Sequence, residues 1–300
     1  MSVAFAQSLP AWAGEIVRSI RAKQCNTFLV HGVPADLVPV RDGQGLRFLS
    51  LDAFLISELF GKWPSIVSYN RAEGLIFATP EARGHFQEKL KSYDAVHGTS
   101  WSQSLPRDAA NCFALLDSYF KTCAAQTPSR PVAVLLPFAE TVVPAGDASY
   151  RTPEDRAVLV YLRKWSQDPA LLAKNIVVVL VTESLAEIDP KLVRSTGSRE
   201  VEIVRPDAAE RLEYLEAVRP ADWYGKMSEL PAQRLAELTA GLTRVQLAHV
   251  LDGADADNAK ITRDGLRKIK KEVIEAEGLG LLEYVEPKYD LSMVAGMPMV

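Results

Sequence analysis

The stretch Ile176-Val177-Val178-Val179-Leu180-Val181 decides the fold, because six consecutive apolar residues leave no polar face on a strand. A second run, Val132-Ala133-Val134-Leu135-Leu136, shows the same lack of polar alternation. A strand that is apolar on both faces needs cover on both faces, which is typical of a parallel sheet packed between helices. These two runs therefore predict the centre of an α/β sheet.

Shorter apolar runs and helical patterns extend this sheet on both sides. Further strands are expected at residues 27–30, 65–69, 75–78 and 201–204. Residues 51–59 and 108–122 carry apolar side chains at helical spacing. Thr152-Pro153-Glu154-Asp155 has the cap, the proline and the acids of a helix start. Strands that alternate with helices predict a three-layer α/β domain with a parallel sheet.

The pattern changes near Pro206, after which we expect only helices. Asp207 with Glu210, and Thr243 with Gln246, have the spacing of capping boxes that start two of them. Two more helices are expected at residues 231–240 and after Thr262. The sequence thus predicts an α/β domain over 1–205, followed by a small all-α domain over 206–278.

The bulk composition excludes several classes of protein. The 300 residues are 48% hydrophobic with a formal net charge of −4, which argues against a chain that coats nucleic acid. No run reaches the roughly 18 apolar residues that span a bilayer, and the N-terminus lacks a secretory signal. The three cysteines lie far apart without a Cys-x-x-Cys pair, so we expect buried thiols and no metal site. These features predict a cytoplasmic protein.

Residues 181–194 carry a more specific signal. The motif Asp189-Pro190-x-Leu192-x-Arg194 resembles the segment of AAA+ ATPases that leads from sensor 1 to the arginine fingers. Pro206, Asp207 and Arg211 resemble the start of the family's lid, and residues 235–251 resemble its sensor 2 helices. The resemblance implies a P-loop-NTPase-like domain with a helical AAA lid, in a family that uses ATP and magnesium.

The end of the chain is similar to a linker between AAA domains. Residues 281–291 resemble the segment that leads into a second AAA domain in two-domain bacterial and plastid AAA proteins of poorly defined function. In that group the first module is degenerate and the second carries the ATPase chemistry. The resemblance implies that residues 279–300 are a linker towards a further AAA domain, and that this domain and other copies of the chain are partners.

The nucleotide-binding motifs of the family are missing. A P-loop needs glycines, a lysine and a hydroxyl, yet residues 31–36 read His-Gly-Val-Pro-Ala-Asp, with Asp36 adding negative charge. Pro137 and Phe138 stand where the Walker B acids belong, Glu140 follows two residues too late, and Glu183 replaces the sensor 1 asparagine. We therefore assign no catalytic, cofactor-binding or metal-binding residue to this chain.

Two arginines keep a role that the resemblance implies. Arg194 matches the arginine of the motif, and Arg199 lies close to the position of the second one. In AAA rings such arginines reach the neighbour's ATP and stabilise transition-state charge. Arg194 and Arg199 are thus candidate trans-acting arginines. The alternative is a solvated surface arginine, or one that pairs with Asp189 or Glu200. Arg244 falls in the sensor 2 region and is expected to be an exposed helix residue.

Three functions remain open at this point. The first is a catalytically degenerate AAA+ module that is a structural or regulatory part of an AAA-type ATPase. The second is an active ATP-binding domain with a non-standard pocket near residues 31–36. The third is a stand-alone protein-interaction adaptor. We expect residues 137–151 to be a loop. The sequence does not determine whether side chains fill an empty nucleotide pocket, although the apolar Pro137 and Phe138 would suit such filling.

Overall fold

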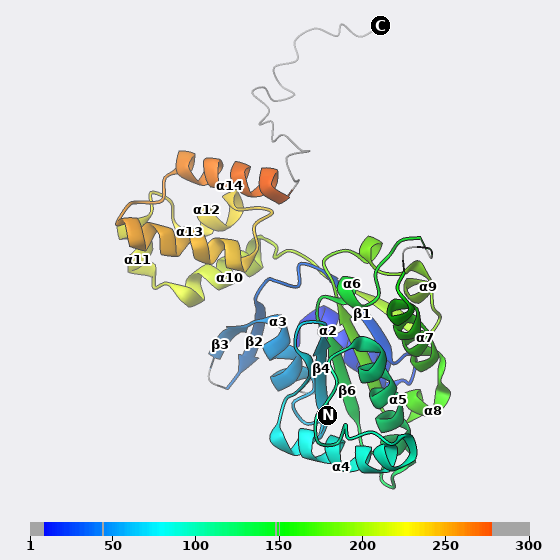
Figure 1. Ribbon diagram of the computed structural model, residues 1–300. Coiled ribbons are helices and arrows are strands. Elements are labelled where there is room, and N and C mark those ends of the chain that lie inside the picture. The colour runs from blue at the N-terminus through cyan, green and yellow to red at the C-terminus, as the bar shows by residue number, and fades with distance from the viewer. Residues whose placement is uncertain (1–8, 44, 148, 150, 278–300) are drawn as a thin grey trace, which may run out of the picture. The chain divides into compact units, whose positions relative to one another are not determined.

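The structure is a computed structural model that describes residues 9–43, 45–147, 149 and 151–277. Its contacts divide the chain between Arg205 and Pro206 into an α/β unit and a helical unit (Figure 1). The expected linker over 279–300 lies outside the described residues. No helix in the described ranges is long and apolar enough to cross a membrane.

A six-stranded sheet forms the centre of the α/β unit, in the order β5-β4-β6-β7-β1-β8. The strands are β1 (Thr27–Gly32), β4 (Ile66–Asn70), β5 (Gly74–Phe77), β6 (Val132–Leu136), β7 (Ile176–Val181) and β8 (Ser198–Ile203). Neighbouring strands are parallel except β4 and β5, which are antiparallel. The expected parallel sheet is therefore mixed at one edge, because the few residues between β4 and β5 allow a hairpin but no crossover.

Helices cover both faces of this sheet, which confirms the three-layer prediction (Figure 1). One face packs against α2 (Ala11–Arg21), α3 (Leu51–Phe54) and the π-helix η1 (Leu55–Leu59). The other packs against α4 (Pro80–His97), α5 (Ala109–Ala125), α7 (Pro153–Gln167), α8 (Pro169–Ala173) and α9 (Pro190–Val193). Every residue of β6 and β7 is buried, as the two unbroken apolar runs predict.

Several short elements were not expected. The hairpin of β2 (Val38–Asp42) and β3 (Gly45–Leu49) forms a separate two-stranded sheet between β1 and α3. Residues 137–151 are not entirely a loop, because α6 (Ala139–Val142) lies within them. A short 3-10 helix, η3 (Leu185–Glu187), follows β7. Each of these elements is too short to give a periodic pattern that could be read from the sequence.

The helix starts that were predicted from local sequence are confirmed. The Thr152 hydroxyl accepts a hydrogen bond from the Asp155 amide at 3.1 Å, and the Asp155 carboxylate accepts one from the Thr152 amide at 3.0 Å. Asp207 and Glu210 form the same reciprocal pair. Such pairs involve only residues three positions apart, so the sequence alone determines them.

The buried indole of Trp165 organises one side of the core. Its ring stacks on Phe113 at 5.3 Å between centroids, and its Nε1–H donates to Asp117 Oδ1 at 2.9 Å. Lys164 and Lys121 also contact the Asp117 carboxylate, at 2.7 and 2.8 Å. Burial raises the pKa of Asp117, but these hydrogen bonds outweigh burial and leave the pKa below its usual value.

The described part of the helical unit, which ends at residue 277, contains one helix more than the four expected. Its helices are α10 (Ala208–Val218), α11 (Ala221–Met227), α12 (Ala232–Leu238), α13 (Arg244–Asp257) and α14 (Arg263–Glu277). The buried Arg211 connects two of them, because its Nε donates to the Ala236 carbonyl at 2.9 Å. On the surface of the unit, the indole N–H of Trp223 donates to Asp255 at 2.8 Å, and the Arg219 guanidinium lies 5.5 Å from the indole ring.

The expectation that Arg244 is exposed was wrong. Its side chain is only 7% exposed and lies 3.7 Å from Glu210 Oε2. Arg244 is the first residue of α13, which packs against α10, so its side chain turns onto the acidic start of α10 instead of into solvent. The arginine therefore has a structural place within the helical unit.

We predict that Asp117→Asn lowers the free energy of unfolding at pH 7 by about 1–3 kcal/mol, because the amide cannot hold two ammonium groups and the indole equally well. The depressed pKa of Asp117 means that this contribution is present above about pH 5 and is lost as the pH falls through the lowered value. Urea unfolding at pH 7 and pH 3 should show a smaller difference between mutant and wild type at pH 3. Glu216→Gln, at an exposed position of α10, is the control and should show no such difference.

Candidate functional site

The topology of the sheet creates a crevice at the carboxyl ends of three neighbouring strands, β6, β7 and β1. The chain leaves β1 towards α3 on one face of the sheet, whereas it leaves β6 and β7 towards helices on the other face. Ligands of open α/β sheets bind where the connections diverge in this way. A cavity of about 310 Å³ lies at this place, and we call it the switch-point pocket.

The first strand reaches this pocket through a glycine. Gly32 has a φ of +104°, and a Cβ at this position would lie 2.4 Å from the Ile203 carbonyl oxygen of β8. Its amide donates to the Glu183 carbonyl at 3.2 Å, and the next amide, of Val33, donates to Ile203 at 3.0 Å. This glycine therefore permits the close approach of β1 and β8.

Three carboxylates line the switch-point pocket. Asp52 lies in the first turn of α3, Glu140 lies in α6 and Glu183 follows β7. None of the residues that line the pocket is a lysine, arginine or histidine. Asp52 is exposed at its outer side, but desolvation by the surrounding protein atoms of the pocket wall raises its pKa. The Oε2 atom of Glu140 is buried and makes no hydrogen bond within the described ranges.

Phe138 stands at the mouth of this pocket in a conformation that phenylalanine rarely adopts. Its φ of +55° and ψ of +45° place it in the left-handed region, which is unfavourable for a bulky side chain. The residue is 64% exposed, so it lines the pocket with Pro137 but does not plug it. Pro137 and Phe138 therefore belong to the wall of the pocket, and a cavity of about 310 Å³ remains beside them.

The chemistry of this lining is opposite to that of a phosphate site. A site for nucleotide phosphates presents cations and backbone N–H groups, whereas this one presents carboxylates. The described residues contain no cluster of three or more histidine, cysteine or acidic side chains that could hold a metal ion. The sequence indicated Asp36 as the source of negative charge near the phosphate position, but Asp36 is buried and does not line the pocket. The negative charge of the pocket comes from Asp52, Glu140 and Glu183.

The two candidate arginines lie in different environments. Arg194 caps the C-terminus of α9; it is exposed, and its guanidinium makes no hydrogen bond or ion pair with another residue in the described ranges. Arg199 is half-buried at the amino end of β8, where it donates to Ser19 Oγ at 2.6 Å and lies 3.5 Å from Glu15. The structure therefore leaves Arg194 accessible and holds Arg199 against α2.

The remaining members of the motif have structural roles. Asp189 is buried, caps α9 by accepting from the Lys191 amide at 2.7 Å, and forms an ion pair with Arg151. Leu192 is completely buried in the core. Asp189 thus pairs with Arg151, whereas one alternative from the sequence paired it with an arginine of the motif.

Two family models match consecutive parts of the chain. An AAA+ chaperone N-terminal Rossmann-like domain matches residues 3–204, and an AAA+ chaperone second helical domain matches residues 209–278. The chain belongs to the AAA+ chaperone family. This membership confirms the resemblance that the motif around Asp189 indicated, and it agrees with the α/β and helical units of the structure. No curated protein matches the chain.

Sequence reasoning missed part of the pocket of this AAA+ protein. Ser50 and Asp52 line it, yet they lie eighteen and more residues beyond β1, across the unexpected hairpin. Only a prediction of that hairpin would have shown that the start of α3 returns to the end of β1. Glu140 and Glu183 were noted as departures from motifs, and the structure brings both to the pocket.

We predict that Phe138→Asn raises the free energy of unfolding by about 0.5–1 kcal/mol, because asparagine tolerates the left-handed region and little buried area is lost. Phe138→Ala is the matched control, since alanine removes the ring but keeps the backbone strain. Urea unfolding should order the stabilities as Asn above wild type and Ala no higher than wild type. Equal stability of the Asn and Ala variants would show that the strain is not there.

Proposed function

We propose that this chain is a catalytically degenerate AAA+ module that serves as a structural or regulatory part of an AAA-type ATPase. The observation that carries the proposal is the switch-point pocket, which has three carboxylates and no cation among its lining residues. The family's own ligand site is therefore retained as a cavity without the groups that bind and polarise a triphosphate.

Electrostatics makes nucleotide binding unfavourable in this pocket. The electrostatic repulsion between a carboxylate and a phosphate oxygen about 4 Å apart is on the order of 4 kcal/mol at an effective dielectric constant of 20. A lysine normally offsets such repulsion in a P-loop, and none lines this pocket. Magnesium would add positive charge, but the acids at Asp52, Glu140 and Glu183 do not form a cluster that could hold it.

We predict that calorimetry of the 300-residue chain with magnesium and ATP shows no saturable binding up to about 1 mM. The matched variant Asp52→Asn/Glu140→Gln/Glu183→Gln removes the repulsion, so it should bind ATP no more weakly than the wild type. A thermal shift on adding nucleotide provides an independent measurement, because a ligand that binds the folded state raises its stability.

The opposite result has a clear meaning. Wild-type binding in the micromolar range, lost in the neutral variant, would show that the carboxylates hold magnesium-bound nucleotide. That outcome would replace the present proposal by the alternative of an active domain with a non-standard pocket.

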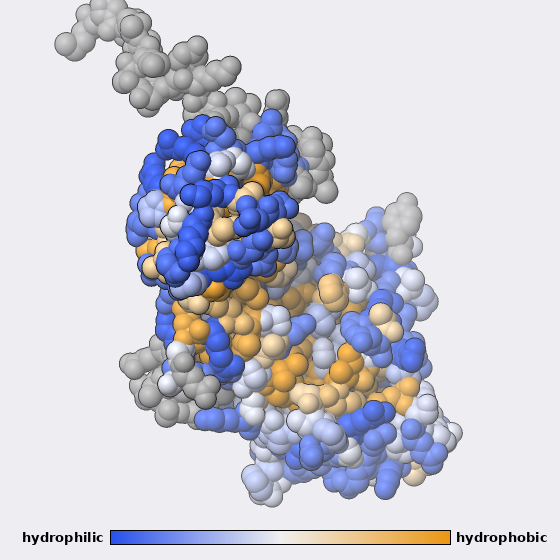
Figure 2. Space-filling model, turned by 90° about the vertical axis from the view of Figure 1, so that its left-hand side faces the viewer, coloured by the Kyte–Doolittle hydropathy of each residue, from blue (hydrophilic) through white to orange (hydrophobic). Residues whose placement is uncertain are grey.

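We also propose that the module acts through partners, namely a second AAA domain and further copies of the chain. Family membership supports assembly in general, and Figure 2 shows hydrophobic residues at the surface of the α/β unit, where a partner would cover them. Arg194 is the residue that we assign to a trans role, because it is exposed and unpaired within the described ranges. Arg199 holds β8 against α2 instead.

We predict that Arg194→Ala leaves the free energy of unfolding within about 0.5 kcal/mol of wild type, as expected for an exposed side chain. Arg199→Ala should lower it by about 1 kcal/mol, because it removes a hydrogen bond from a charged donor to the buried Ser19. Urea unfolding of both variants measures the difference. A larger loss for Arg194→Ala than for Arg199→Ala would contradict the division of roles.

A further inference from the structure

A second cavity of the α/β unit has a charge opposite to that of the switch-point pocket. It has a volume of about 630 Å³ and lies between α7 and α9, and we call it the basic groove. Its lining residues include four cations and two aliphatic side chains: Arg151, Arg156, Leu159, Val160, Arg163 and Lys191. No acidic residue lines it, although the whole chain has a net charge of −4.

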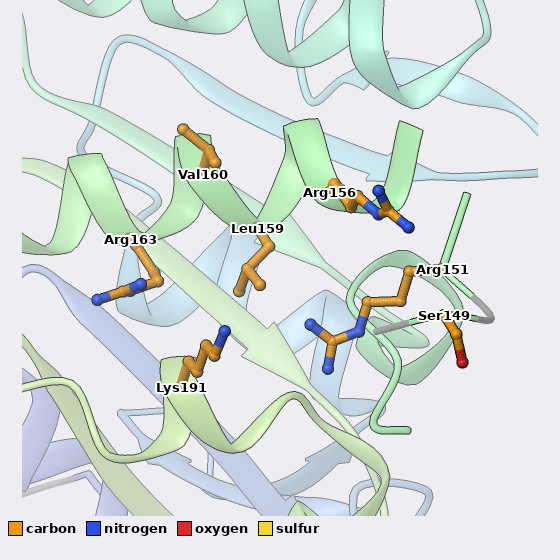
Figure 3. A pocket seen from close by; sticks show the side chains of 7 residues that line it. All are labelled: Ser149, Arg151, Arg156, Leu159, Val160, Arg163 and Lys191. Atoms are coloured by element: carbon orange, nitrogen blue, oxygen red, sulfur yellow. The ribbon is translucent and has the colours of Figure 1, made fainter. Parts of the chain in front are cut away.

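Only some of these cations have a structural role in the fold. Arg151 is largely buried and forms its ion pair with Asp189, so it fastens the loop before α7 to α9. Arg163 and Lys191 are exposed, and their side chains form no hydrogen bond or ion pair with any residue that the structure describes. In the view of Figure 3, these two lie at one end of the groove and Arg151 and Arg156 at the other.

The floor between the cations is apolar. Leu159 lies in the centre of the view in Figure 3, and Val160 on the next position of α7 is 64% exposed. A free phosphate could pair with the cations, but it would leave this aliphatic surface exposed to solvent. A nucleic acid would use the charge, but the groove has no aromatic side chain on which a base could stack. Alternating cations and aliphatic groups match a peptide with carboxylates and an aliphatic side chain.

The spacing along α7 also matches a peptide. Arg156, Val160 and Arg163 lie four and three residues apart, so they share one face of the helix. The two arginines are separated by about 10 Å along the axis, at 1.5 Å per residue. An extended peptide advances about 3.3 Å per residue and only its alternate side chains share a face, so two acids four positions apart lie about 13 Å apart on the same side. The long arginine side chains can reach across this distance, and the residue midway between the acids also faces the helix.

We propose that the basic groove binds an extended acidic segment of a partner protein, with one carboxylate near Arg156, another near Arg163 and Lys191, and an aliphatic side chain on Leu159 and Val160. This proposal stands apart from the state of the switch-point pocket, which shares no residue with the groove. The segment is recognised by charge at both ends and by apolar contact between them.

The test uses the full chain and a fluorescein-labelled peptide with the core Leu-Glu-Ala-Val-Ala-Glu-Leu, in which both glutamates and the valine share one face when the peptide is extended, and binding is followed by fluorescence anisotropy. We expect saturable binding that weakens with added salt, and a loss of at least about tenfold in affinity for Arg163→Glu. Val160→Ser should weaken binding several-fold without changing its salt dependence. Arg83→Glu makes the same charge change at an exposed position of α4, and it should leave the affinity within about twofold after correction for net charge.

Three outcomes would overturn the proposal. The first is equal binding of a peptide with glutamine in place of both glutamates. The second is tighter binding of an oligothymidylate of equal charge through Arg163, which would make the groove a nucleic-acid site. The third is absence of peptide binding by a chain whose circular dichroism and thermal unfolding show that it is folded.

Discussion

The burial of β6 and β7 on both faces is the constraint on which the α/β unit depends. Neither strand carries a polar residue that tolerates water, so helices must lie on both sides of the sheet. Neighbouring parallel strands must be joined by crossover connections. Where one connection runs to one face of the sheet and the next runs to the other face, the two chains separate at the carboxyl edge of the sheet. The divergence falls between β1 and β7, which is why a pocket exists there whatever its lining residues are.

Position and chemistry have separate origins in this pocket. The sheet order places it, and this order depends on apolar residues in the middle of the strands. The lining depends on residues just after the strand ends, among them Pro137, Phe138 and Glu183. A fold can therefore be kept intact by its core while its site changes completely, since the two sets of residues hardly overlap. The carboxylates of the pocket and the cations of the basic groove illustrate how far such surfaces can diverge on one scaffold.

The parts of the fold that were predictable are those set by local or strongly periodic signals. The apolar runs gave the central strands, and the reciprocal caps at Thr152 and Asp207 gave two helix starts. The β2–β3 hairpin and the reversal of β5 depend on short segments without a clear period. The burial of Arg244 depends on the packing of α10 against α13, and the positive φ of Phe138 depends on the backbone after β6. Neither has a signal within the neighbouring sequence, so both escaped prediction.

The placement of the tryptophans gives the two units different optical properties. Trp12, Trp63, Trp101 and Trp165 belong to the α/β unit, and Trp223 alone belongs to the helical unit. Trp223 combines a hydrogen bond to Asp255 with a guanidinium at its ring, so its emission responds to a single local cluster on the unit's surface. A chain in which the other four indoles are replaced by phenylalanine would fluoresce from the helical unit only. In such a chain the melting of the helical unit could be followed by its own indole emission, separately from the unfolding of the sheet.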